Sequence, residues 1–125
     1  MTQPPPVPPG PLGSLTDLAA DAAFAEVSPG IERHAMHAGA FSVLRIRLRA
    51  GARLPQHEHP HEQYIHLLSG RVQVTVQLPD RRAGFMLSPG DGVRLPPWLP
   101  HETEALLDSQ TIEVFAPARD DLAAQ

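Results

Sequence analysis

The stretch "HEHPHEQYIHLLSG", residues 57–70, places three histidines at alternate positions and then a glutamine. Residues two apart in a β-strand point to the same face, so His57 and His59 could hold one metal ion. Neutral imidazole is a ligand for zinc, iron, nickel and copper. Two histidines supply only part of a coordination shell, and the rest must come from elsewhere in the fold. The stretch alone therefore leaves two interpretations, a metal site or a histidine-rich loop that binds nothing.

Composition limits the classes of function. The 125 residues are 42% hydrophobic, which predicts one globular domain with a real core. A net charge of −4 does not indicate the basic surface that nucleic-acid binding requires, and we expect no nucleic-acid partner. No membrane-spanning run and no secretory signal pattern is present, so we expect a cytoplasmic protein without membrane contact. Without cysteine, any metal must be held by nitrogen and oxygen.

The first residues differ from the rest of the chain. Six prolines occur among the first eleven residues, which predicts a disordered, proline-rich tail over 1–13. A single domain is expected over 14–125. Its first stretch, Ser14 to Phe24, has leucines and alanines at helical spacing and predicts a short helical turn.

From Ile31 onward the hydrophobic pattern has a period of two, as expected for β-strands. Leu44, Ile46 and Leu48 alternate with arginines, which we expect on a solvated face. Turn residues separate many short strand-like runs, and this spacing predicts an all-β sandwich or barrel. The further expected strands are Arg71–Leu78, Gln63–Leu68, Gly84–Leu87, Val93–Leu95, His101–Leu107 and Thr111–Ala116.

Five spaced residues between positions 51 and 70 carry a family resemblance. Gly51, His57, His59, Gln63 and Gly70 keep every spacing of the first motif of the cupin superfamily, which this run resembles. In that motif a glutamate usually stands where this chain has Gln63.

The second cupin motif is also matched. Gly90, Pro96 and His101 keep its spacing, with Trp98 where a glycine is usual and Ala105 where an asparagine often stands. The two motifs together span about residues 51–105. The resemblance implies a double-stranded β-helix, a small jelly-roll barrel with one divalent metal inside. The protein ligands that it implies are His57, His59, Gln63 and His101.

The glutamine changes the charge of this implied site. Its amide oxygen can still coordinate a hard or borderline cation. Three imidazoles and an amide leave the +2 charge of the metal uncompensated, whereas a glutamate would reduce it to +1. This favours a Lewis-acid role over a higher oxidation state, and hence a lyase or isomerase over a dioxygenase. Such ligands suit zinc, nickel, iron, cobalt or manganese alike.

A second set of candidates lies near the C-terminus. Glu113 and Phe115 share one strand face, so if Phe115 faces the barrel interior, Glu113 does too. A buried acid near a cation is a candidate general acid or base. Arg119, just past Pro117, could clamp a substrate carboxylate.

This ending resembles one cupin subgroup, the KdgF-type pectin-degradation proteins. The shared features are the run His59-Pro60-His61-Glu62-Gln63 and an ending with an acid, Phe115, Pro117 and Arg119. The subgroup's acid is usually an aspartate, so Glu113 is a departure. The resemblance implies a metal-dependent isomerase or lyase that linearises 4,5-unsaturated uronates. Glu113 would then move a proton, while Phe115 and Arg119 would bind the substrate, a small anionic sugar.

Two other functions stay open at this point. One is a polyketide-cyclase-like or dioxygenase cupin, and the other is a non-catalytic cupin that binds a small ligand. Ile112 and Val114 form an apolar outer face on their strand, which predicts a homodimer. His61 is expected at the rim of the site, whereas Tyr64 and His66 are expected on the outer face.

Overall fold

The computed structural model describes residues 24–122, which form ten β-strands and one short turn of 3₁₀ helix. The predicted tail over 1–13, and all but the last residue of the predicted helical turn over 14–24, lie outside the described residues. The strands are β1 (Ala25–Ser28), β2 (Ile31–His37), β3 (Ser42–Leu48), β4 (Arg53–His57), β5 (Glu62–Ser69), β6 (Val72–Gln77), β7 (Arg82–Leu87), β8 (Gly92–Leu95), β9 (His101–Ala105) and β10 (Ser109–Ala116), followed by the helical turn η1 (Asp120–Leu122).

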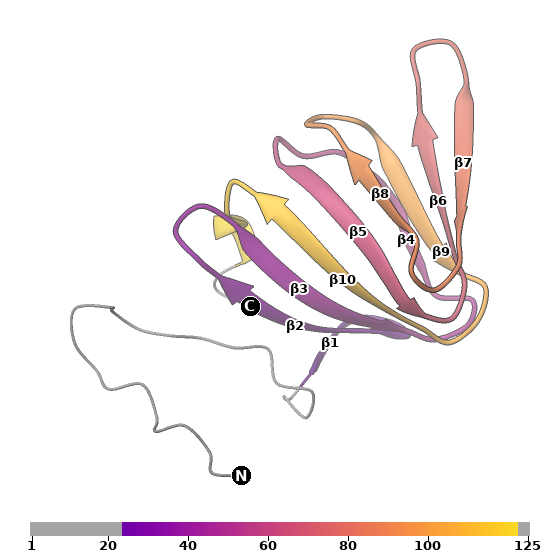
Figure 1. The fold of residues 1–125 in the computed structure, drawn as a ribbon, viewed down its shortest axis with the longest axis horizontal. Coiled ribbons are helices and arrows are strands. Elements are labelled where there is room, and N and C mark those ends of the chain that lie inside the picture. The colour runs from indigo at the N-terminus through magenta and orange to yellow at the C-terminus, as the bar shows by residue number, and fades with distance from the viewer. Residues whose placement is uncertain (1–23, 123–125) are drawn as a thin grey trace, which may run out of the picture.

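The strands form two antiparallel sheets. One sheet has six strands in the order β1-β2-β3-β10-β5-β8, and the other has four in the order β4-β9-β6-β7. Strands distant in sequence are neighbours, as where β10 lies between β3 and β5 (Figure 1). The prediction of an all-β jelly roll is confirmed for the part of the chain that the structure describes.

The core follows the predicted alternation. Leu44, Ile46 and Leu48 of β3 are buried, while Arg47 on the opposite face stacks over the ring of Phe24 at 3.7 Å. Each buried aliphatic side chain contributes roughly 1.5–3 kcal/mol relative to exposure. The valines of β6 are buried in the same way, within a second cluster of apolar side chains between the sheets. Burial of one face of β3 and of β6 therefore fixes which of their side chains point into the barrel.

One local expectation is wrong. His57 and His59 do not share a strand, because β4 ends at His57 and His59 lies in the connection to β5. Pro60 has no backbone N–H and cannot continue a ladder of hydrogen bonds. No separate strand was expected over β1, β2 or β4, although the period-two pattern was expected to begin at Ile31. β4 contains Pro55 and has an irregular register.

Strand register brings the candidate residues together. In the larger sheet, Gln63 of β5 is directly opposite Phe115 of β10, and Phe115 is opposite Ser42 of β3. In the smaller sheet, His57 of β4 is opposite His101 of β9. The two sheets thus present an amide and an aromatic ring on one side of the barrel, and two imidazoles on the other.

Two motif glycines provide a matched test of the fold. Both Gly51 and Gly70 have a left-handed backbone, with φ of +87° and +92°. A Cβ at Gly70 would collide with the Ser109 side chain and the Asp108 carbonyl, whereas a Cβ at Gly51 would meet nothing within 4 Å. We expect Gly51→Ala to lower the free energy of unfolding by roughly 1–2 kcal/mol from backbone strain alone.

Gly70→Ala adds the steric collision, and we expect a loss of about 3 kcal/mol or more. Denaturant unfolding of both variants beside the wild type measures the difference. Equal losses in the two variants would contradict the close approach at Gly70.

Candidate metal centre and active site

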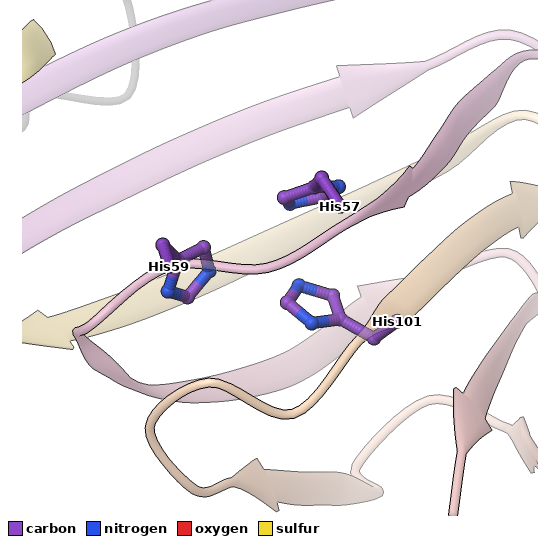
Figure 2. Close-up of side chains that lie close together, drawn as sticks. All are labelled: His57, His59 and His101. Atoms are coloured by element: carbon purple, nitrogen blue, oxygen red, sulfur yellow. The ribbon is translucent and has the colours of Figure 1, made fainter.

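Three histidines converge inside the barrel. One ligand nitrogen from each of His57, His59 and His101 lies within 4.8 Å of the others. Their ring centroids are 4.4 Å apart for His57 and His101, and 5.1 Å apart for His59 and His101. Figure 2 shows the three rings around one common space, with His57 at the end of β4, His59 in the loop that follows it and His101 at the start of the neighbouring strand β9.

Backbone carbonyls orient all three rings. A carbonyl oxygen only accepts, so the Nδ1 atom that faces it carries the proton in a neutral imidazole, and the lone pair stays on Nε2. This is the arrangement that orients histidine ligands in metal sites. The acceptors are the carbonyl oxygens of Pro55, His61 and Leu99, which lie 2.9, 3.1 and 2.8 Å from Nδ1 of His57, His59 and His101.

Burial keeps two of the imidazoles neutral. It lowers the pKa of His101 to about 4, and His101 is only 1% exposed. The pKa of His59 is lowered by burial first and then by the positive charge of Arg119. The buried Nε2 atom of His101 has no hydrogen-bond partner. A buried lone pair without a donor is costly, and a metal ion would satisfy it.

Gln63 places its amide oxygen beside this cluster. Its Oε1 is 3.0 Å from Nε2 of His59, and its Nε2 donates a hydrogen bond of 2.7 Å to Glu113. Both ring nitrogens of His59 thus face an acceptor oxygen, and a neutral imidazole can donate to only one of them. When the proton is on Nδ1, a cation between Nε2 and the Gln63 oxygen relieves the repulsion between their lone pairs. Adjacent ligands of an octahedral ion with bonds of about 2.1 Å lie about 3.0 Å apart. The four side chains therefore fit a divalent metal ion.

Glu113 faces the barrel interior, as its parity with Phe115 predicts, and it is only 4% exposed. Its two carboxylate oxygens accept hydrogen bonds from Gln63 at 2.7 Å and from the Thr111 hydroxyl at 2.9 Å. Burial raises the pKa of Glu113, while these two hydrogen bonds and the charge of Arg119 oppose the rise. A proton can therefore stay on this carboxyl at a higher pH than on an exposed glutamate.

Arg119 lies against Phe115 beside the histidines. Its guanidinium is 4.8 Å from the Phe115 ring centroid, and that ring is 5.7 Å from the His59 ring. The backbone N–H of Arg119 donates to the buried Ser42 hydroxyl at 2.8 Å, which fixes the chain after β10. The Nε and Nη2 atoms bind both carboxylate oxygens of Asp121, at 3.0 and 2.8 Å, and this pairing lowers the pKa of Asp121 to about 2.

One cavity of about 120 Å³ joins these groups. It is lined by the candidates His57, Gln63, His101, Glu113, Phe115 and Arg119. Arg33 of β2 also lines the cavity, and it was not among the site residues predicted from the sequence. Its strand parity with the buried Ile31 was the signal that could have found it.

The remaining candidates lie outside the cavity lining. His61 is buried, with its ring 5.4 Å from that of His59. Tyr64 is on the outer face, as predicted, and its hydroxyl lies 2.9 Å from Nδ1 of His66. The homodimer predicted from Ile112 and Val114 stays a prediction. None of the helical segments in the described residues could cross a membrane.

Comparison with known proteins agrees with this geometry. A family model described as the cupin domain matches residues 44–115. The chain is similar to the structure of KdgF from Halomonas sp., with a TM-score of 0.76 and 29% identity, covering 84% of this chain and 96% of that one. None of the curated proteins matches the sequence.

Two more distant structures share the fold alone. An RmlC-like cupin from Shewanella frigidimarina NCIMB 400 has a TM-score of 0.79 at 21% identity, covering 89% of this chain and 97% of that one. Oxalate decarboxylase from Lactobacillus farciminis has a TM-score of 0.72 at 19% identity, covering 86% of this chain and 35% of that one.

The histidine cluster predicts a change in metal content on substitution. We expect His101→Ala to lower the bound divalent metal from about one ion per chain to a small fraction of it, because one ligand is lost. Metal analysis of the purified variants measures this, with His66→Ala on the outer face as the matched control. Equal metal content in the two variants would contradict the site.

The lowered pKa of His101 predicts a pH dependence of stability in the metal-free protein. The unfolded chain binds a proton at His101 below about pH 6.5, whereas the folded chain does not until about pH 4. Stability should therefore fall as the pH drops through this window. Unfolding midpoints from pH 7 to pH 4 measure the slope, which His101→Asn should reduce. A slope that persists unchanged in this variant would assign the effect to other groups.

Proposed function

The chain belongs to the cupin family, and we propose that it is a metal-dependent isomerase or lyase that opens the ring of a small anionic sugar such as a 4,5-unsaturated uronate. The observation that carries this proposal is a cavity whose lining combines candidate metal ligands, a buried acid and an arginine. The similarity to KdgF, over most of both chains, supports the same chemistry.

The ligand set favours a Lewis acid. His57, His59, His101 and Gln63 would hold the ion without adding any negative charge. A bound divalent metal would polarise the substrate's oxygen atoms and stabilise the negative charge that develops on them. Zinc, nickel, iron, cobalt and manganese all suit these nitrogen and oxygen ligands.

Two residues would bind and orient the sugar. Arg119 carries a guanidinium at the cavity wall, and its fork geometry matches a carboxylate. Phe115, packed against both His59 and Arg119, presents an aromatic surface to the ring of the sugar. Held in this way, the substrate would place its double bond beside the buried acid.

Glu113 would move the proton. Ring opening of an unsaturated uronate removes a proton from the anomeric hydroxyl, and the bond between the anomeric carbon and the ring oxygen breaks as a carbonyl group forms. The enol that results becomes a ketone when a proton adds to a carbon of the double bond, so no atom is gained or lost. A buried carboxyl of raised pKa is suited to both transfers. The side chain is longer than the aspartate of the KdgF-type proteins, and here it reaches Gln63 and Thr111 at once.

Loss of the ultraviolet absorbance of a 4,5-unsaturated galacturonate monomer tests the activity. We expect the metal-loaded protein to accelerate this loss over the spontaneous blank, and a chelator to abolish the acceleration. Glu113→Gln should lower the rate roughly 10²-fold or more, because a general acid or base contributes on this order. Its metal content should stay unchanged, and Glu104→Gln, at an exposed position of β9, is the isosteric control.

Other outcomes separate the alternatives. No acceleration by the metal-loaded protein would exclude the uronate substrate. Iron-dependent consumption of oxygen would favour a dioxygenase instead. If Glu113→Gln loses the metal together with the activity, Glu113 acts by holding Gln63 and not by moving a proton.

A further inference from the structure

A second guanidinium lies in the same cavity as Arg119. Arg33 of β2 lines the cavity together with Arg119 and Glu113. Its position is fixed by register, since Arg33 is opposite Ile46 of β3, whose side chain is buried. Ile31, two residues earlier on β2, is only 1% exposed, so this strand face points into the barrel.

Arg33 lies within electrostatic range of the charged groups at this end of the cavity. Burial lowers its pKa, the positive charge of Arg119 lowers it further, and the negative charge of Asp121 opposes both. Two guanidinium groups therefore share one cavity wall, although like charges repel in a medium of low dielectric. An arrangement of this kind is stable when an anion lies between or beside the two cations.

Asp121 is the anion that the structure shows. Both of its carboxylate oxygens bind Arg119, at Nε and Nη2. The Nε and Nη2 edge of the Arg119 guanidinium, which is best suited to bind a carboxylate, is thus occupied by the carboxylate of Asp121. Asp121 lies on the short turn η1, and its side chain is about half exposed, so a carboxylate from solution can compete for this place.

The balance of charge favours a further anion. Two acidic groups are within electrostatic range of the arginines, since Asp121 acts on Arg33 and Glu113 is acted on by Arg119. A divalent ion held by neutral ligands would add a charge of +2 beside this cavity, and the ligands themselves would not compensate it. An anionic ligand is the group that would compensate this charge.

We propose that Arg33 is a second carboxylate-binding residue, which forms with Arg119 one anion subsite where Asp121 is the internal competitor. The ligand class is a small carboxylate that reaches from this subsite toward the three histidines. The inference rests on the proposed function only in taking that carboxylate to be part of the substrate.

Binding to the metal-loaded full chain tests the proposal. The probes are D-galacturonate, malonate and acetate, with D-galactose as the neutral counterpart, titrated by calorimetry. We expect Arg33→Gln to weaken carboxylate binding roughly tenfold or more, through loss of a charge-assisted hydrogen bond. Arg33→Lys should recover part of the affinity. Arg94→Gln changes an exposed side chain on β8, an edge strand of the same sheet; it is the control of equal charge and should bind as the wild type does.

Asp121→Asn provides a test of opposite sign. Removing the internal competitor should strengthen carboxylate binding several-fold, while binding of D-galactose stays unchanged. Unchanged affinity in Arg33→Gln, or no carboxylate binding to the wild type, would overturn the proposal. So would weaker binding in both Arg33→Gln and Asp121→Asn together with lowered melting temperatures, because that pattern indicates a structural cluster.

The two proposals can fail separately. Carboxylate binding that depends on Arg33, without turnover of the unsaturated galacturonate, leaves the subsite and excludes the uronate reaction. Turnover with the same KM in wild type and Arg33→Gln supports the reaction and overturns the role of Arg33.

Discussion

A carboxylate buried in a β-barrel must find hydrogen-bond donors, and the site depends on how Glu113 finds them. The register of β10 against β5 places Gln63 opposite Phe115 and within diagonal reach of Glu113. The amide nitrogen of Gln63 donates a hydrogen bond to Glu113, and the amide oxygen of Gln63 therefore faces His59. One hydrogen bond between two neighbouring strands therefore decides which atom of Gln63 is offered to a metal.

In this arrangement the negative charge lies on Glu113, behind Gln63, and not on a candidate ligand itself. In the usual cupin motif an acid coordinates the metal directly, whereas here an amide faces the histidines and the acid lies behind it. A ligand shell made of these side chains would be neutral, and the full charge of a bound ion would be available to attract an anion. Arg33 and Arg119 add positive charge to the cavity lining. Under our proposal, both halves of the site would therefore favour negatively charged small molecules.

The period-two alternation predicted an all-β sandwich or barrel, and the resemblance to the cupin motifs implied the jelly roll. The same motifs drew attention to His57, His59 and His101, which lie close together in the structure, and strand parity predicted that Glu113 is buried with Phe115. The sequence could not predict contacts that depend on long-range register, such as the hydrogen bond from Gln63 to Glu113. Arg33 was missed because an arginine in an alternating strand usually faces solvent. The histidines still converge although His59 lies off the strand, because the loop before β5 turns its ring inward.

The three histidines differ in their contact with water. His59 and His101 are buried, whereas His57 is exposed at the end of β4. An ion held here would have one side open to solvent, so it could enter and leave without any opening of the barrel. Neutral nitrogen and oxygen ligands discriminate little among the divalent transition metals. Because the ion could exchange with solvent and the ligands discriminate little among metals, the identity of the bound metal would depend on which ions the cell supplies more than on the ligand set.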